Sequence, residues 1–150
     1  MAQDTGAVAE KAPAFGMQVA YSARRPVDLV GTEHLAFDRL LTSSDVISLH
    51  CPLTPETRHL IDQKALAKMK RSAYLINTSR GPIVDEKALY EALADRRIAG
   101  AALDDVLMGR PEGALETCWR GRSLVREGPQ GRVRREAARD FPGRVAAHAV

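Results

Sequence analysis

The sequence lacks any apolar run that approaches the roughly 20 residues needed to cross a bilayer. Its first residues, MAQDTGAVAE, also lack the basic flank and the apolar block of a secretory signal. These absences predict a cytoplasmic protein with no membrane partner. A chain of 150 residues with 45% hydrophobic residues is long enough to bury one globular core of ordinary size.

Cysteine is scarce. The two cysteines, Cys51 and Cys118, lie far apart and form no CxxC pair. Two separated thiols supply no disulfide framework and too few ligands for a zinc site. We therefore expect both to be free thiols, and we expect no metal site.

Lysine is absent from the last third of the chain. Residues 106–150 contain nine arginines and five acidic residues, which gives 9 − 5 = +4, and the total of +3 leaves 3 − 4 = −1 for residues 1–105. In this tail Gly, Arg and Pro recur, and the apolar residues keep no regular period. The sequence thus predicts a folded region, 1–105, and an arginine-rich tail, 106–150, with no packed fold of its own. A reading-frame slip in a GC-rich gene would produce a change of this kind.

Aromatic residues are also rare in the tail, which offers only Trp119 and Phe141. Nucleic-acid binding favours clustered basic charge, usually with aromatic side chains on which bases stack. Because acidic residues are interleaved with the arginines, we expect no nucleic-acid partner.

Short apolar runs alternate with helical patterns in the folded region. The runs predict strands over 17–21, 45–50, 73–78 and 98–104, each of the kind that is buried on both faces of a sheet. Apolar residues at helical spacing predict helices over 33–41, 62–69 and 85–97, the last two beginning at the capping residues Asp62 and Asp85. This alternation predicts an α/β fold, a doubly wound parallel sheet with helices on both sides.

Ligands bind beyond the carboxyl ends of the strands in such a sheet, so the residues after each run are candidates for function. They are Ser22, Arg24 and Arg25 after the first run, His50, Cys51 and Pro52 after the second, Thr78, Ser79 and Arg80 after the third, and Asp104 after the last. Each has an ordinary structural interpretation, such as a turn proline or a solvated loop arginine. Their shared edge is what favours a functional site.

Residues Val46 to Asp104 resemble the nucleotide-binding domain of the D-isomer-specific 2-hydroxyacid dehydrogenases, which include glyoxylate/hydroxypyruvate reductases and phosphoglycerate dehydrogenase. The motifs are PLTPET, then INTSRG about twenty residues later, then GAALD. Upstream, AVAEKAPAFGMQVAYSARRP resembles the family's first helix and second strand. The resemblance implies an incomplete Rossmann-like domain of an oxidoreductase. Such an enzyme transfers a hydride between a nicotinamide cofactor and a small 2-oxo acid, and its family members are usually homodimers.

The resemblance also implies roles for individual residues. Arg80 would bind the carboxylate and carbonyl oxygens of the 2-oxo acid, a task suited to a planar guanidinium that stays charged. Asp104 would hold the nicotinamide carboxamide. The residues that would line the cofactor are His50, Cys51, Pro52, Thr57, Thr78 and Ser79.

The cofactor preference follows from what stands after the strand at 17–21. An acidic residue there normally accepts hydrogen bonds from the ribose 2′-OH, whereas serine or arginine favours a 2′-phosphate. Here Ser22, Arg24 and Arg25 stand without an acid. We therefore expect NADP or NAD as the cofactor, with NADP favoured.

Two parts of the family pattern are missing. The glycine-rich phosphate-binding turn should precede AVAEKA, where only MAQDTG stands, and Pro13 interrupts the following helical segment. Neither Glu112 nor His148 matches the family's glutamate and histidine, which supply a proton during reduction. The sequence therefore indicates a fragment that is catalytically incomplete. The alternative is a dinucleotide-binding interaction module without enzymatic activity, similar to corepressors of the same fold.

Overall fold

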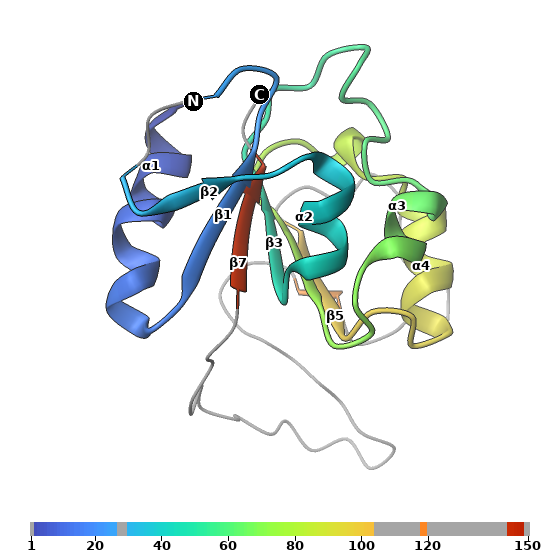
Figure 1. Cartoon of the computed structure of the whole chain (residues 1–150). Helices are drawn as coiled ribbons and strands as arrows, with labels where there is room; N and C mark the ends of the chain where they lie inside the picture. Colours follow the sequence, from blue (N-terminus) through green and yellow to red (C-terminus); the bar gives the residue numbers. More distant parts are fainter. Residues whose placement is uncertain (1, 27–29, 104–117, 120–143, 149–150) are drawn as a thin grey trace.

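The computed structural model describes residues 2–26, 30–103, 118–119 and 144–148. Their strands form one sheet in which every pair is parallel, in the order β2-β1-β7-β3-β4-β5-β6 (Figure 1). The strands are β1 (Gln18–Ser22), β2 (Thr32–His34), β3 (Val46–Leu49), β4 (Tyr74–Asn77), β5 (Gly100–Leu103), β6 (Cys118–Trp119) and β7 (Arg144–His148). The predicted α/β class with a parallel sheet is confirmed.

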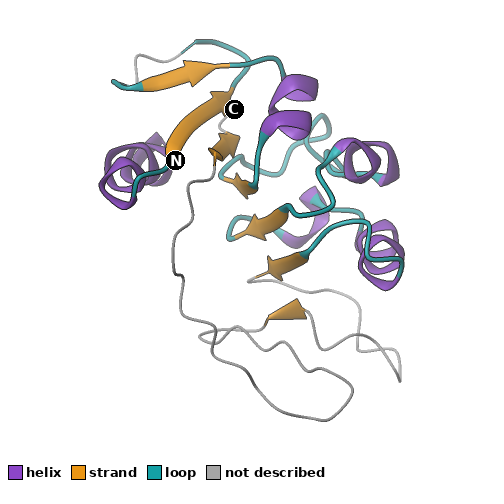
Figure 2. Cartoon of the chain, turned by 60° about the horizontal axis from the view of Figure 1, so that its bottom comes forward, coloured by secondary structure: helices purple, strands orange, loops and turns teal. Residues whose placement is uncertain are grey.

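Helices lie on both faces of the sheet, as Figure 2 shows, with α1 on one face and α2, α3 and α4 on the other. The helical elements are α1 (Ala2–Lys11), the short 3₁₀ helix η1 (Ala12–Phe15), α2 (Phe37–Ser43), α3 (Gln63–Lys68), the 3₁₀ turn η2 (Gly81–Ile83) and α4 (Glu86–Ala94). None of the helices in the described ranges is long and apolar enough to span a membrane.

Most of the core lies between the sheet and the three helices that share one face. Its fully buried members include Leu40 of α2, Ile47 of β3, Leu66 of α3 and Leu75 of β4. A smaller cluster on the other side joins Ala9, Ala12 and Val19, where α1 and η1 meet β1. The larger core supports the strands from which most of the candidate residues extend.

Both predicted capping residues begin their helices. The Asp62 carboxylate accepts a hydrogen bond from the backbone N–H of Ala65 at 2.8 Å, and that of Asp85 accepts from Lys87 and Ala88 at 3.1 and 3.2 Å. These bonds satisfy N–H groups that have no partner within the helix. The apolar face of α4, which comprises Ala88, Leu89, Ala92 and Leu93, is buried.

The helix predicted over 33–41 begins later in the structure. Thr32–His34 instead form β2, a strand at the edge of the sheet, and α2 begins at Phe37. The His34 ring lies 5.1 Å from the Tyr21 ring, and the Leu35 N–H donates to the Tyr21 carbonyl at 2.8 Å. Pairing with β1 thus outweighs the helical spacing of this segment.

Two segments of the arginine-rich tail also lie in the sheet, although the sequence predicted no packed structure for residues 106–150. These are β6 at one edge and β7 between β1 and β3. Strand pairing uses backbone groups, and runs as short as these are too brief to show a hydrophobic period. The described residues do not include 104–117 and 120–143, and Asp104 and Glu112 both fall in the first of these ranges.

Candidate functional site

The carboxyl ends of β1, β3 and β4 lie at the same edge of the sheet. Register pairs Leu49 at the end of β3 with Asn77 at the end of β4. The Ser79 hydroxyl donates to the Leu49 carbonyl at 3.0 Å and so ties the loop after β4 to the end of β3. The structure therefore brings the candidates from these loops to one edge, and only Asp104 lies outside the described residues.

The loop that carries Arg80 is held by the side chain of Asn77, which is 2% exposed. Its Nδ2 donates to the Arg80 carbonyl at 2.8 Å, and its Oδ1 accepts from the Ser79 N–H at 3.0 Å. One amide thus satisfies a donor and an acceptor of the turn. The buried Asn77 side chain thus fixes the backbone of Arg80.

The Arg80 guanidinium itself is exposed. Its Nη1 donates to the Ser79 carbonyl at 3.0 Å, and within the described residues it forms no ion pair. A guanidinium has five N–H donors, so most remain open for a ligand. A carboxylate that approached this edge could accept two parallel hydrogen bonds.

A short ladder fixes the segment that follows Arg80. Pro82 and Ile83 of η2 accept hydrogen bonds from the N–H groups of His59 and Ile61 at 2.9 and 3.2 Å. The Asp85 N–H donates back to the Ile61 carbonyl at 3.0 Å. This ladder connects the loop after β3 with the loop after β4.

Thr57 shapes the loop between β3 and α3 from inside. This side chain is 4% exposed, and its hydroxyl donates to the Pro52 carbonyl at 2.6 Å while accepting from the Thr54 N–H at 2.7 Å. With its hydroxyl already paired, Thr57 determines where Pro52 and its neighbours lie. The Thr57 hydroxyl therefore stabilises the loop through hydrogen bonds to the loop backbone.

His50 and Cys51 follow β3 directly. The Ser48 hydroxyl and His50 Nε2 lie 2.9 Å apart in a hydrogen bond, which holds the half-buried imidazole against the strand. Cys51 is a free thiol that is 1% exposed, as predicted. Burial raises its pKa above the ordinary value of 9.0, and a backbone hydrogen bond offsets part of that rise. The thiol therefore stays protonated at neutral pH and acts as an apolar filler.

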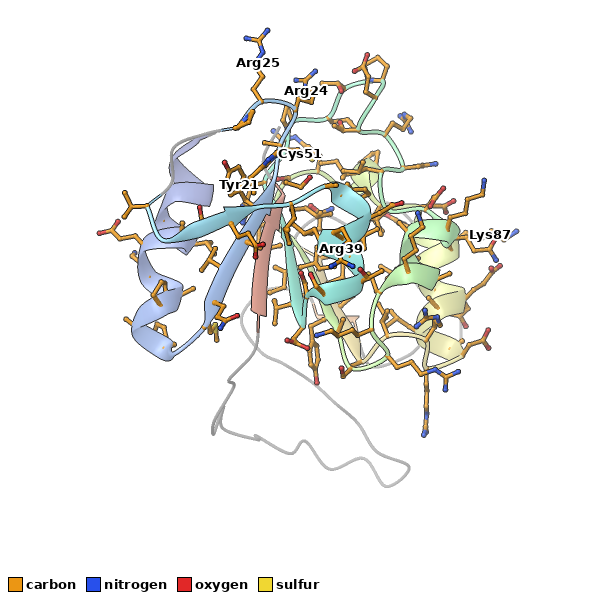
Figure 3. The ribbon with its side chains drawn as sticks, viewed as in Figure 1. Tyr21, Arg24, Arg25, Arg39, Cys51 and Lys87 are labelled. Atoms are coloured by element: carbon orange, nitrogen blue, oxygen red, sulfur yellow. The ribbon has the colours of Figure 1, made fainter. Side chains whose placement is uncertain are left out.

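The end of β1 carries positive charge on its outer side. Ser22 is buried, whereas Arg24 and Arg25 are exposed. Figure 3 shows both arginine side chains projecting away from the sheet beyond the end of β1. Glu56, on the loop after β3, has its pKa lowered by a hydrogen bond from the Thr54 side chain, by its own backbone N–H, and to a smaller extent by the charge of Arg24. The loops after β1 and β3 thus influence each other electrostatically.

Sequence reasoning missed the residues that position the candidates. Asn77 stands inside the INTSRG motif, yet its role depends on a turn that brings its side chain back to Arg80. Ser48 faces His50 because residues i and i+2 of an extended chain lie on the same side. The spacing of two residues between Ser48 and His50 could therefore have predicted this contact from the sequence. His34 and His59 are exposed at the surface.

Residues 5–121 match the family model described as D-isomer specific 2-hydroxyacid dehydrogenase, NAD binding domain. The chain belongs to this family. The match reaches residue 121, past the end of the region, 1–105, that the sequence motifs indicated. The chain is 51% identical over 102 residues to a glyoxylate reductase of Korarchaeum cryptofilum, and this alignment covers 65% of the chain and 31% of the relative.

Another relative and two solved structures are also similar to this chain. A hydroxypyruvate reductase of Thermotoga maritima is 44% identical over 98 residues and is covered over 32% of its length. The NAD-complexed dehydrogenase of Lactobacillus delbrueckii ssp. bulgaricus is 43% identical, with a TM-score of 0.64 over 68% of this chain and 31% of that one. An acyclic imino acid reductase bound to NADPH and D-Arg is 40% identical, with a TM-score of 0.68 over 74% of this chain and 37% of that one.

The chain spans about a third of the length of the curated relatives it matches. The part that it spans matches the NAD-binding domain of the family. Cationic side chains stand at both ends of the edge described above, Arg24 and Arg25 beyond β1 and Arg80 beyond β4. Between them lies the loop after β3, whose backbone is fixed by internal hydrogen bonds.

Proposed function

We propose that this chain forms the cofactor side of an active site that transfers a hydride between a nicotinamide dinucleotide and a small 2-oxo or 2-hydroxy acid. The observation that carries the proposal is the exposed Arg80 guanidinium, which has no acidic partner among the described residues and whose backbone carbonyl accepts a hydrogen bond from Asn77. The names of the relatives, glyoxylate reductase and hydroxypyruvate reductase, support an acid substrate of this class.

In this proposal Arg80 binds the carboxylate of the acid and polarises its carbonyl. A guanidinium keeps its charge across the working pH range and meets a carboxylate with two parallel N–H donors. Because Asn77 and Ser79 hold the backbone of the loop, little ordering is left for the moment of binding. The nicotinamide supplies the hydride when bound, and the loop residues His50, Pro52, Thr78 and Ser79, with Asp104, are proposed to line it.

The role of Arg80 is tested in a protein completed with two parts of a relative, its substrate domain and the segment after residue 105 that carries the family's glutamate and histidine. Arg80→Ala should lower kcat/KM for glyoxylate or hydroxypyruvate by roughly 10² to 10³, since it removes a donor to charge that develops in the transition state. Arg71→Ala is the matched control, because Arg71 is an exposed arginine that precedes β4 at the opposite end of the strand. Equal effects of the two substitutions would refute the role of Arg80.

We expect the 150-residue chain alone to show no Arg80-dependent oxidation of NADPH. Reduction of a carbonyl needs a proton for the developing alkoxide, and an arginine cannot readily release one. The sequence contains no recognisable counterpart of the family's glutamate and histidine pair. Arg80-dependent turnover by the purified chain, measured by loss of NADPH absorbance with either acid, would contradict this expectation.

We further propose that the site prefers NADPH to NADH. Arg24 and Arg25 stand exposed beyond β1, where a 2′-phosphate would lie, and no acidic residue accompanies them on that loop up to Pro26. Arg24→Glu combined with Arg25→Ala should remove a preference of roughly tenfold, which corresponds to about 1.4 kcal/mol. Cofactor fluorescence titrations measure both affinities, and equal affinity of the unmodified protein for the two cofactors would end the proposal.

The second candidate is a dinucleotide-binding interaction module without enzymatic activity. It is favoured by the same cofactor edge together with the absence of a recognisable proton-donating pair in the sequence. The two candidates separate in the completed protein. Arg80-dependent turnover supports the enzyme, whereas cofactor binding with no turnover supports the module.

A further inference from the structure

β1 and β3 are not adjacent in the sheet, because one strand position lies between them. β7 fills it, with Val145 in register with Val19 on one side and with Val46 on the other. Neighbouring strands lie about 4.8 Å apart, so two strands on either side of a third are separated by about 10 Å and cannot hydrogen-bond each other. β7 therefore pairs two rows of backbone groups that would otherwise face a gap.

The position that β7 occupies has a defined meaning in a doubly wound sheet. The usual strand order is 3-2-1-4-5-6, with the first strand in the centre and the first helix packed beside it. Here β2 and β1 lie on one side of β7, and β3, β4 and β5 lie on the other. Helix α1, which comes first in the chain, contacts β7. A segment from the carboxyl-terminal part of the chain thus stands in the place of a first strand.

The residues of β7 suit a central position. Its interior reads Val145, Ala146, Ala147, a run of small apolar residues of the kind that fits a strand covered on both faces. In the register with β1, Val145 pairs with Val19 and Ala146 pairs with Ala20, so two of the five pairs join identical residues. Both β1 partners are buried.

The distance along the chain also permits this arrangement. Residues 120–143 connect β6, at one edge of the sheet, with β7 near its centre. Four strand spacings of about 4.8 Å separate β6 from β7, roughly 19 Å, whereas a connection of this length can extend about 3.3 Å per residue. The return to the centre therefore needs no strain in the connection.

We propose that β1 and β3 form a strand-acceptor site whose occupant is Arg144–His148, and that this occupancy holds the two halves of the cofactor edge together. One half is the end of β1 with Arg24 and Arg25, and the other is the end of β4 with Arg80. Within the described residues β1 pairs only with β2 and β7, so β7 is its sole connection through the sheet to β3. The part of the proposal that concerns the cofactor rests on the proposed function.

Hydrogen exchange on the full chain tests the acceptor site. Val145→Pro removes a ladder N–H inside β7, and Ala138→Pro, in the tail but outside β7, is the matched control. We expect exchange in β1 and β3 to become at least about tenfold faster in Val145→Pro and to stay unchanged in Ala138→Pro. A synthetic peptide of residues 143–150 should restore protection when added in excess.

The hydrogen-exchange results of the two variants decide whether β7 occupies the acceptor site. Loss of protection throughout the sheet in Val145→Pro, with Ala138→Pro unaffected, also supports β7 as part of the fold. Unchanged exchange in β1 and β3, or equal acceleration in both variants, overturns the proposal.

A second measurement addresses the cofactor edge. Val145→Pro should weaken NADPH binding by at least about tenfold relative to Ala138→Pro. Unchanged NADPH affinity together with lost protection would overturn the claim that β7 joins the two halves. A full chain that fails to bind NADPH but shows the expected exchange pattern would contradict the proposed function and support the strand acceptor.

Discussion

The buried amide of Asn77 should stabilise the folded chain measurably. Its amide makes two hydrogen bonds, to the Arg80 carbonyl at 2.8 Å and from the Ser79 N–H at 3.0 Å, and the side chain is 2% exposed. A hydrogen bond contributes about 0.5 to 1.5 kcal/mol net, and a buried group left without a partner costs more. Asn77→Ala should therefore lower the free energy of unfolding by about 1 to 3 kcal/mol.

Two further variants sharpen this prediction. Thr78→Ala alters the adjacent, exposed residue, so its effect should stay within about 0.5 kcal/mol. Asn77→Asp keeps the acceptor for Ser79 but sets a carboxylate oxygen against the Arg80 carbonyl, so at neutral pH it should destabilise at least as much as Asn77→Ala. Urea unfolding followed by circular dichroism measures all three. If Asn77→Ala costs no more than Thr78→Ala, the reasoning about the loop is wrong.

Two other predictions concern residues outside the Arg80 loop. Asp85→Ala should cost about 1 kcal/mol in urea unfolding because it removes the cap of α4; Asp95→Ala, at the exposed end of the same helix, is the control, and equal costs would show that the cap contributes nothing. Cys51 should react with iodoacetamide at pH 8 far more slowly in the folded chain than in urea when Cys118→Ser removes the other thiol, since burial raises the pKa of Cys51. The folded thiol keeps its proton while the unfolded chain ionises near 9.0, so stability should also fall as the pH rises above that value; a rate equal to that in urea would refute the buried thiol.

The parts of the fold that the sequence predicted are those set by local pattern. The central strands β3, β4 and β5 read as apolar runs because both faces of a parallel strand are buried. The caps at Asp62 and Asp85 need only the few residues that follow them. Family motifs then placed the candidate residues on loops that the structure brings to one edge.

The parts that the sequence did not predict depend on distant pairing. β2 has exposed residues at Glu33 and His34, and it becomes a strand because β1 is beside it. β7 lies more than a hundred residues from β1 in the sequence. Its five residues contain no local pattern that predicts pairing with β1. The side-chain bonds of Asn77 depend on the path of a turn, which the residue types leave open.

The candidate site contains both kinds of feature, those set by local sequence and those set by distant strand pairing. The loops after β3 and β4 are joined by hydrogen bonds between neighbours, from Ser79 to Leu49 and along the His59–Ile61 ladder, so the position of Arg80 is set without the tail. The arginines beyond β1 are held differently, because within the described residues β1 reaches β3 through the sheet only by way of β7. If the proposed function holds, the acid would be bound by residues that are close in sequence, whereas the distance between the acid and the cofactor ribose would depend on β7, a strand from the far end of the chain.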